Sequence, residues 1–345
     1  MILYFPAMIP GIISFGIYLF FSWWLHRGLS RAIRRQPDFS HNGPHVGISI
    51  IIAAHNEAGA ISETLSSLLK QDYPRDRFEI IVVADRCTDR TAEEVRRFEK
   101  DAENLRLFEI PAVPEAVSPK KYALQQGIQY ARFRYLIMMD ADCRVKSGYL
   151  QTFNIYFRNG TDVLINVPKM KPGNSWLYHY LHPERLFTWS ISAAAAGNDN
   201  PFLAFGTTWG YTREIYEKSG GLTPLLRSLS GDDDLLVYRM GQAGARTDFC
   251  FLKEGWGETR FPASLKSFII QRRRHHSAGR YYAAGPRTGY LFYHLSNYML
   301  WFLPLFFLPS LIFLVLKWLI DYLTLRRSAI HFRESLSLRN YLFFE

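Results

Sequence analysis

The sequence predicts an α/β protein with a mostly parallel central sheet, helices on both faces, and apolar membrane segments at both ends. Three observations support this prediction. Strand-length runs of β-branched residues alternate with helical patterns between residues 46 and 139. The two ends are nearly free of charge, whereas the middle has the composition of a soluble domain. Polar residues collect directly after three of the expected strands, where parallel sheets bind ligands.

The expected strands are short apolar runs, and each is followed by a helix pattern. They are expected at residues 46–53, 78–84, 105–110 and 134–139. The helices between them are expected at residues 57–70, about 90–100 and 120–131, the second capped by Thr88 or Asp89. Because short connections from strand to helix to strand place successive strands parallel, the alternation predicts a parallel sheet covered by helices.

The N-terminal segment, residues 1–25, carries no charged side chain. At about 1.5 Å per residue it is long enough to cross a hydrocarbon layer of about 30 Å. Trp23 and Trp24 stand at its end and arginines follow it, so we expect an uncleaved transmembrane anchor whose C-terminal flank is cytoplasmic.

A second apolar region covers residues 289–325 and contains Pro304 and Pro309. One long tilted helix or a hairpin of two short helices would both fit. The following residues, 326–345, begin as a basic stretch that should be cytoplasmic, and this favours a transmembrane hairpin. The chain ends in YLFFE, which looks like the start of a further apolar segment.

The charge balance is basic, with 41 Lys and Arg against 31 Asp and Glu. Much of the excess lies beside the apolar segments, which suits contact with membrane lipids and argues against nucleic-acid binding. The three cysteines form no CxxC pair, so neither a disulfide framework nor a zinc site is expected.

The polar clusters after the strands read AAHNE, ADRCTDRT and MMDADC. Asp140 and Asp142 follow a wholly apolar strand, and two such carboxylates repel each other unless they share a cation or a proton. Their oxygens suit Mg²⁺ or Mn²⁺, which could neutralise a departing diphosphate. For Asp89, capping of the next helix is the simpler interpretation.

Seven motifs occur in one order: ISIIIAAHNE, VVADRCTDRT, PKKYAL, MMDADC, GTTWGYTREIYEKSGGL, SGDDDLL and QRRRHH. This series resembles the family-2 inverting glycosyltransferases with a GT-A nucleotide-binding fold. Within them it resembles the membrane-bound branch of cellulose, hyaluronan and poly-N-acetylglucosamine synthases. The resemblance covers roughly residues 44–325 and implies a cytoplasmic GT-A domain at residues 44–280 in a multi-pass protein of the inner or plasma membrane.

The resemblance implies a donor site for a nucleotide-diphosphate sugar, by analogy UDP-linked. Glu57 and Asp85 match positions that contact the base and ribose. Lys120 matches a lysine near the base or phosphates, although Lys121 could take this role. Asp140 is expected by the ribose and metal, and Asp142 as the main metal ligand.

An inverting transfer needs a base that deprotonates the acceptor hydroxyl. By resemblance Asp233 is this base, and Asp232 stands beside it on the acceptor side, where the family often has Glu. The acidic run could also cap the following helix. Trp209 could stack on an acceptor sugar or belong to the core.

The QRRRHH segment resembles the QxxRW motif of the processive branch. Gln271 and Arg274 match, whereas His275 replaces the tryptophan that packs beneath the acceptor sugar. We expect Arg274 at the diphosphate and a neighbouring arginine at lipid head groups.

The sequence therefore predicts transfer of one sugar to a lipid-linked or glycan acceptor, with membrane lipids as further contacts. A processive polysaccharide synthase is the alternative, and a silent nucleotide-sugar sensor is a third class. A partner subunit is compatible with each of them.

Overall fold

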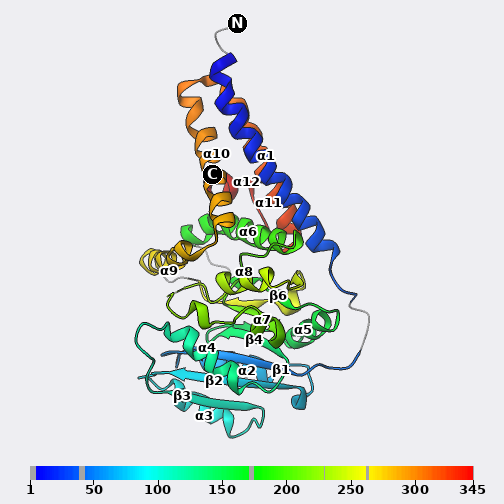
Figure 1. Cartoon of the computed structure of the whole chain (residues 1–345), viewed down its shortest axis with the longest axis vertical. Helices are drawn as coiled ribbons and strands as arrows, with labels where there is room; N and C mark the ends of the chain where they lie inside the picture. The colour runs from blue at the N-terminus through cyan, green and yellow to red at the C-terminus, as the bar shows by residue number, and fades with distance from the viewer. Residues whose placement is uncertain (1–4, 39–42, 171–174, 229, 262–263, 345) are drawn as a thin grey trace.

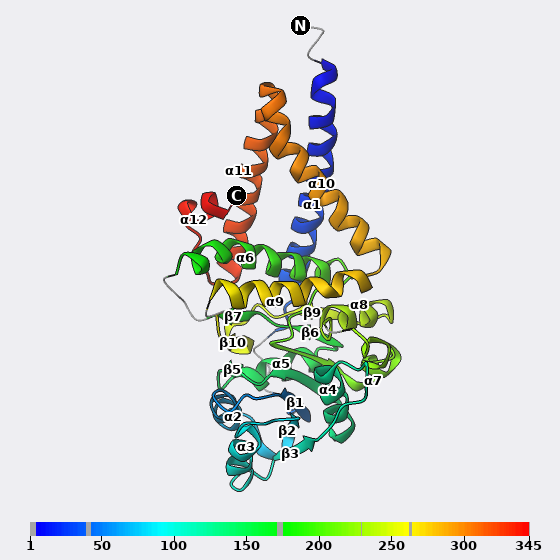
Figure 2. The ribbon, with the colours of Figure 1, turned by 90° about the vertical axis from the view of Figure 1, so that its left-hand side faces the viewer.

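The computed structural model describes residues 5–38, 43–170, 175–228, 230–261 and 264–344. The chain is arranged in three parts along its long axis (Figure 1). A sheet domain occupies one end, and a group of long helices occupies the other. Two helices, α6 (Trp176–Gly197) and α9 (Leu265–Ser277), lie across the axis between these parts, as Figure 2 shows.

The central sheet has seven strands in the order β3-β2-β1-β4-β8-β6-β9. The pairs β3–β2, β2–β1, β1–β4 and β6–β9 are parallel, whereas β8 runs antiparallel to both of its neighbours. The strands are β1 (Ile48–Ala54), β2 (Phe78–Asp85), β3 (Leu105–Ile110), β4 (Tyr135–Asp140), β6 (Val163–Ile165), β8 (Thr208–Thr212) and β9 (Thr247–Phe249). The prediction of a mostly parallel sheet is confirmed.

The core of this domain lies between the sheet and the helices that cover it. All residues of β2 are buried, and so are all but one of β1, because both faces of these strands are covered. The domain helices are α2 (Ile61–Leu69), α3 (Thr91–Glu99), α4 (Pro119–Tyr130), α5 (Tyr149–Arg158), α7 (Arg213–Lys218) and α8 (Asp234–Gln242).

One predicted helix begins later than expected. We expected it to start at Glu57, but α2 starts at Ile61. Residues 57–60 instead form a turn, in which the Glu57 backbone N–H donates to the Thr91 hydroxyl at 2.7 Å. This turn leaves the Glu57 side chain at the edge of the sheet.

A small second sheet joins β5 (Arg144–Val145), β10 (Gly257–Thr259) and β7 (Pro168–Met170). Its middle strand, β10, carries Thr259 to Asp142, whose carboxylate accepts a hydrogen bond of 3.4 Å from the Thr259 hydroxyl. The second sheet therefore supports one side of the predicted metal site.

Helix α6 is pressed against α1 (Phe5–Arg34) through small residues. A Cβ atom added at Gly28 would lie 2.2 Å from the Ala194 carbonyl oxygen, and one added at Gly197 would lie 2.0 Å from the Gly28 carbonyl oxygen. Only glycine permits such close backbone contact. This packing ties the long N-terminal helix directly to the sheet domain.

The C-terminal region forms a helical hairpin. Helix α10 (Ala284–Phe306) and helix α11 (Leu311–His331) are joined by a short 3-10 turn, η6 (Leu308–Ser310). The break thus falls near Pro309. At residues 326–345 we expected a basic loop and the start of a further apolar segment. There α11 continues to His331, and the short helix α12 (Leu338–Phe344) packs back on it. The Tyr341 hydroxyl donates to the Trp318 carbonyl at 2.7 Å.

Two helices in the described residues are long and apolar enough to cross a membrane, over Met8–Arg34 and Leu308–His331. Large apolar side chains of the helical group point outward, among them Phe20, Phe302 and Phe306. Polar groups lie inside instead. The Lys317 ammonium is 2.8 Å from the Asp321 carboxylate, which also accepts a 2.8 Å hydrogen bond from the Tyr18 hydroxyl.

Candidate active site

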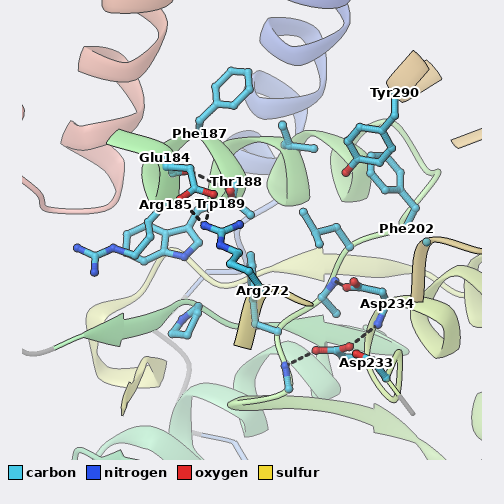
Figure 3. A pocket seen from close by; sticks show the side chains of 18 of the residues that line it. Glu184, Arg185, Phe187, Thr188, Trp189, Phe202, Asp233, Asp234, Arg272 and Tyr290 are labelled. Atoms are coloured by element: carbon cyan, nitrogen blue, oxygen red, sulfur yellow. Dashed lines mark hydrogen bonds and ion pairs between the residues drawn. The ribbon is translucent and has the colours of Figure 1, made fainter. Parts of the chain in front are cut away.

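One large cavity of about 2010 Å³ runs through the middle of the molecule. It begins at the carboxyl ends of β1, β2 and β4, passes the three consecutive aspartates 232–234, and continues between α1, α10 and α11. Figure 3 shows the part of this cavity that lies between the aspartates and α6. The predicted residues that line it are Glu57, Asp85, Lys120, Asp140, Asp142, Asp232, Asp233 and Gln271.

Asp85 and Asp140 reach the cavity because their strands end there. They are the last residues of β2 and β4, and β1 lies between these two strands. The Arg86 guanidinium donates to both oxygens of the Asp85 carboxylate, at 2.7 and 3.0 Å. Arg86 itself has a positive φ of 48°, an uncommon backbone conformation at the end of this strand.

Glu57 and Asp142 concentrate negative charge at the same edge. Burial raises the pKa of Asp142, and the charge of Asp140 raises it further. Burial also raises the pKa of Glu57, followed by the charge of Asp142, while Arg260 opposes both shifts. The charges of these carboxylates therefore act on one another, and Arg260 neutralises them only in part.

The carboxylate pair of Asp140 and Asp142 fits a hard divalent cation. Mg²⁺ and Mn²⁺ take oxygen ligands, and Mg²⁺ usually keeps several waters and phosphate oxygens besides one or two carboxylates. Within the described part of the chain, no three His, Cys, Asp or Glu side chains are grouped so that they alone could hold a metal. A cation at Asp140 and Asp142 would therefore share its coordination with the donor phosphates.

Lys120 rather than Lys121 lies in the cavity. The Lys120 ammonium is 2.8 Å from Asp140 and 3.0 Å from Asp232, so it joins the donor end to the acidic run. Burial lowers the pKa of Lys120, but the two carboxylates raise it more strongly. The Lys121 ammonium is fully buried and donates to the Ser228 and Leu225 carbonyls at 2.6 and 3.1 Å. Lys121 thus has a structural role.

The three consecutive aspartates have three different partners. Asp232 pairs with Lys120. Asp233 accepts backbone hydrogen bonds from Gly206 at 2.7 Å and from Asp234 at 2.8 Å, the second of which caps α8. Asp234 accepts from the Ala204 N–H at 3.1 Å and from the Tyr282 hydroxyl at 2.8 Å. Capping thus accounts for only part of this acidic run.

The pKa of the Asp233 carboxyl group differs from that of an ordinary aspartate. Burial and the charge of Asp232 raise the pKa of Asp233 to about 6, although Lys120 and two backbone N–H groups oppose the shift. A carboxylate of this basicity is suited to accept a proton near neutral pH. A Cβ atom at Gly206 would lie 3.1 Å from the Asp233 carboxylate, so glycine allows the backbone to approach it.

Trp209 does not belong to the site, so its expected role as an acceptor contact is wrong. It lies in β8, in the middle of the sheet between β4 and β6, and only 1% of its surface is exposed. Its ring packs against Tyr211 with 4.7 Å between ring centroids. Trp209 is therefore a core residue that holds the sheet together.

The QRRRHH segment lies in α9, beneath α6. Gln271 lines the cavity, as does Arg272. The backbone of Arg274 and His275 is helical, but their side chains lie outside the described residues. Their expected contacts with the diphosphate and the acceptor therefore stay predictions.

Sequence reasoning missed the contribution of α6, of the loop that follows it and of the residues just before α10. Glu184, Arg185 and Trp189 of α6 line the cavity, as do Phe202 and Tyr282. The segment WLYHYLHPERLFTW has the aromatic and charged composition of a helix at a boundary between two environments, and this signal was available in the sequence.

The sheet with acidic strand ends, extended by an antiparallel strand, is a GT-A fold. Residues 49–220 match the family model described as Glycosyl transferase family 2. The chain belongs to this glycosyltransferase family.

Relatives and a solved structure agree with this assignment. The chain is 28% identical over 200 residues to the probable glycosyltransferase YdaM of Bacillus subtilis (strain 168), covering 56% of this chain and 47% of that protein. It is 35% identical over 96 residues to a poly-beta-1,6-N-acetyl-D-glucosamine synthase of Staphylococcus epidermidis, covering 28% and 22%. The chain thus spans less than half the length of these two curated relatives.

A solved mannosyltransferase from Pyrobaculum calidifontis, PcManGT, in complex with GDP-Man and Mn²⁺, has a similar fold. Its TM-score is 0.61 at 19% identity, and the match covers 97% of this chain and 88% of that chain. At this identity the likeness supports the fold.

Proposed function

We propose that this protein is an inverting, metal-dependent glycosyltransferase. It moves a sugar from a nucleotide-diphosphate sugar to a lipid-linked or glycan acceptor at a membrane. One observation carries the proposal: a single cavity joins the acidic strand ends to the interior of the apolar helices. The donor would bind at the sheet edge, and the acceptor would arrive from the helices.

At the donor end, Glu57 and Asp85 would contact the base and ribose, and Asp140 and Asp142 would hold Mg²⁺ or Mn²⁺. The cation supplies charge neutralisation for the departing nucleoside diphosphate. The fit of the two carboxylates and the Mn²⁺ in the complex of the structural neighbour support this assignment. Lys120 pairs with both Asp140 and Asp232 and so keeps these two carboxylates close together at the reaction centre.

The transfer step then proceeds by inversion. The acceptor hydroxyl oxygen forms a bond to the anomeric carbon while the bond from that carbon to the diphosphate oxygen breaks. The hydroxyl proton goes to the Asp233 carboxylate, and the electron pair of the broken bond leaves with the diphosphate. The raised pKa of Asp233 and its place beside the cavity support this role.

The membrane side of the proposal rests on the long helices. Helices α1 and α11 have the length and hydropathy of membrane spans, and α10 lies beside them with large apolar side chains outward. Arginines stand near the ends of α1 and α11 that adjoin the sheet domain, and by the positive-inside rule they support a cytoplasmic position for this domain.

A purified-protein assay tests the proposal. Full-length protein in detergent is incubated with a panel of nucleotide sugars and Mg²⁺ or Mn²⁺, and release of the nucleoside diphosphate is measured. We expect turnover of at least one donor, loss of turnover in EDTA, and loss in Asp233→Asn. Donor binding without turnover under every condition would instead identify a nucleotide-sugar sensor.

Product length separates single transfer from the processive alternative. That alternative draws on the short match to the poly-N-acetylglucosamine synthase and on the cavity between the helices. A product that carries one added sugar supports single transfer, and a ladder of long chains supports a synthase.

A further inference from the structure

Lys121, near the start of α4, carries a positive charge that is buried without a carboxylate partner. None of its surface is exposed. In the described part of the chain its ammonium forms no ion pair with an Asp or Glu side chain, and its N–H groups donate to neutral oxygens instead. Burial of an unpaired charge is costly, so a side chain that only filled this space would stabilise the fold better without the charge.

The oxygens around this ammonium come from one short segment of the chain. Lys121 Nζ donates to the carbonyl oxygens of Leu225, Ser228 and Ser230, at 3.1, 2.6 and 2.8 Å, and to the Ser228 hydroxyl. The Ser228 hydroxyl in turn lies 3.0 Å from the Leu225 carbonyl and 2.9 Å from the Ser230 carbonyl. Because an ammonium has three N–H groups and no acceptor, it can hold several carbonyl groups at one point. The segment surrounds Lys121 as a loop surrounds a bound cation.

This segment leads directly into the three consecutive aspartates. Ser230, which lines the cavity, is followed by Gly231 and then by Asp232. Gly231 has a φ of 87°, and a Cβ atom added there would lie 2.6 Å from the Leu235 side chain. The turn between the segment and the aspartates therefore requires glycine. Across this tight turn, the carbonyl group that Lys121 holds is only two residues from Asp232.

Lys120 and Lys121 contact different parts of the acidic run. The Lys120 ammonium is 3.0 Å from the Asp232 carboxylate and so restrains a side chain in the cavity. The Lys121 ammonium restrains the main chain that precedes this side chain. On the far side, the Gly206 N–H donates to the Asp233 carboxylate at 2.7 Å. Lys121 is therefore the contact that fixes where the backbone of the acidic run begins.

We propose that Lys121 is a positioning residue of the transfer reaction: its ammonium gathers the preceding segment at one point and so fixes the proposed base, Asp233, beside the cavity. The inference rests on the proposed function and adds to it a residue that does not touch the substrate. A general base has to lie within hydrogen-bond reach of the acceptor hydroxyl. A displacement of about 1 Å can lower the rate about 10²-fold. Lys121 therefore acts on the transfer step and not on donor binding.

The alternative role of Lys121 is purely electrostatic. Burial raises the pKa of Asp232, but Lys120 and, to a lesser extent, Lys121 lower it. If Lys121 acted through its charge alone, removing one oxygen of its shell would leave the rate unchanged. Ser228→Ala makes this distinction, because it removes the hydroxyl that contacts Lys121 and keeps the charge.

The experiment compares Lys121→Met, Ser228→Ala and the control Gln125→Ala in full-length protein in detergent, with a donor that the wild type turns over. Gln125 lies one turn after Lys121 on α4, and its side-chain amide donates to the Thr223 hydroxyl at 2.9 Å. The control therefore removes a contact between α4 and η3 (Thr223–Leu225), at the start of the same segment, but no charge. The measurements are kcat, the donor KM, the melting temperature, and amide hydrogen exchange between η3 and α8.

Lys121→Met should lower kcat about 10- to 100-fold, because the base is displaced. The donor KM should stay unchanged, since the proposed donor contacts belong to other elements. Amides between η3 and α8 should exchange faster than in the wild type, because the segment loses its shared contact. Ser228→Ala should change kcat and exchange in the same direction but less, and it carries the test if Lys121→Met does not fold. Gln125→Ala should keep the kcat of the wild type.

Three results would overturn the inference. These are an unchanged kcat in a folded Lys121→Met variant, a rise in its donor KM without a fall in kcat, or wild-type kcat and exchange in Ser228→Ala. In each case turnover of the donor by the wild type would leave the proposed function standing. No turnover of any donor by the wild type would remove the proposed function, and this inference with it.

Discussion

The pH dependence of the reaction should report the ionisation of Asp233. Its pKa is raised from the ordinary 3.8 to about 6, first by burial and then by Asp232. A base works only when ionised, so kcat/KM should fall as pH falls through about 6. At pH 5 about one tenth of Asp233 is ionised, and the rate should be about tenfold below its value at pH 7.5.

The same shift has a cost in stability, with the opposite dependence on pH. A carboxyl group whose pKa is raised by folding is less easily ionised in the folded state, so it destabilises the fold wherever it is ionised. The corresponding penalty is at most about 3 kcal/mol above pH 6, and it disappears below about pH 4. Because Asp233 faces an open cavity, solvent screening should reduce it to about 1–2 kcal/mol.

Two variants of the acidic run make the assay specific. Asp233→Asn should lower kcat about 10²- to 10⁴-fold at pH 7.5, the usual contribution of a general base, and should remove the fall near pH 6. Asp234→Asn is the matched control, because its amide can still accept from the Ala204 N–H and donate to the Tyr282 oxygen. This variant should keep most of the activity and the same fall near pH 6.

The assay is the initial rate of transfer between pH 4.5 and 8.5 for the wild type and both variants. Asp142 and Glu57 also have raised pKa values, so the profile is repeated with saturating Mn²⁺, which holds the metal-binding carboxylates ionised. The reasoning is refuted if the rate stays constant down to pH 4.5, or if Asp234→Asn loses as much activity as Asp233→Asn.

Three further predictions concern the metal, the helices and the core. Asp142→Asn should abolish metal-dependent transfer and the rise in melting temperature that Mn²⁺ gives the wild type; full activity in excess EDTA would contradict the metal assignment. Lys317→Met alone should destabilise the protein by about 3–5 kcal/mol, because it leaves the buried Asp321 charge without its lysine partner. The double variant Lys317→Met with Asp321→Leu should restore much of the melting temperature. Equal melting temperatures for the single and double variants would contradict this prediction. Trp209→Ala should cost about 3–5 kcal/mol of unfolding free energy, measured by denaturation in detergent, as removal of a large core side chain does; a stable variant that only lost acceptor affinity would return Trp209 to the site.

The sequence alone was sufficient for the fold class, for strands β1 to β4 and for the acidic residues at the ends of these strands, whereas it did not predict β6, β8 or β9. Strands such as β1 and β2 are buried on both faces, so their sequences are continuous apolar runs that can be recognised without the structure. Asp85 and Asp140 follow directly because a parallel sheet brings the ends of neighbouring strands together. The long apolar segments at the two ends could also be predicted, since their apolar composition does not depend on one particular packing partner.

Only the tertiary structure decided between adjacent or equivalent side chains. Lys120 and Lys121 are adjacent residues of the same type. Because they lie on different faces of α4, Lys120 reaches Asp140, whereas Lys121 donates to backbone carbonyl groups. Trp209 was suited to a sugar site or to the core, and its place in the middle of the sheet decided for the core.

The same holds for contacts between distant segments. Arg272 meets Glu184 across 88 residues, and Tyr282 meets Asp234 across 48. Periodicity along a chain records whether a residue is buried, because each element faces either core or solvent. It does not record which distant side chain shares that environment, since this depends on how whole elements pack. The residues that line the acceptor end of the cavity were decided at that level.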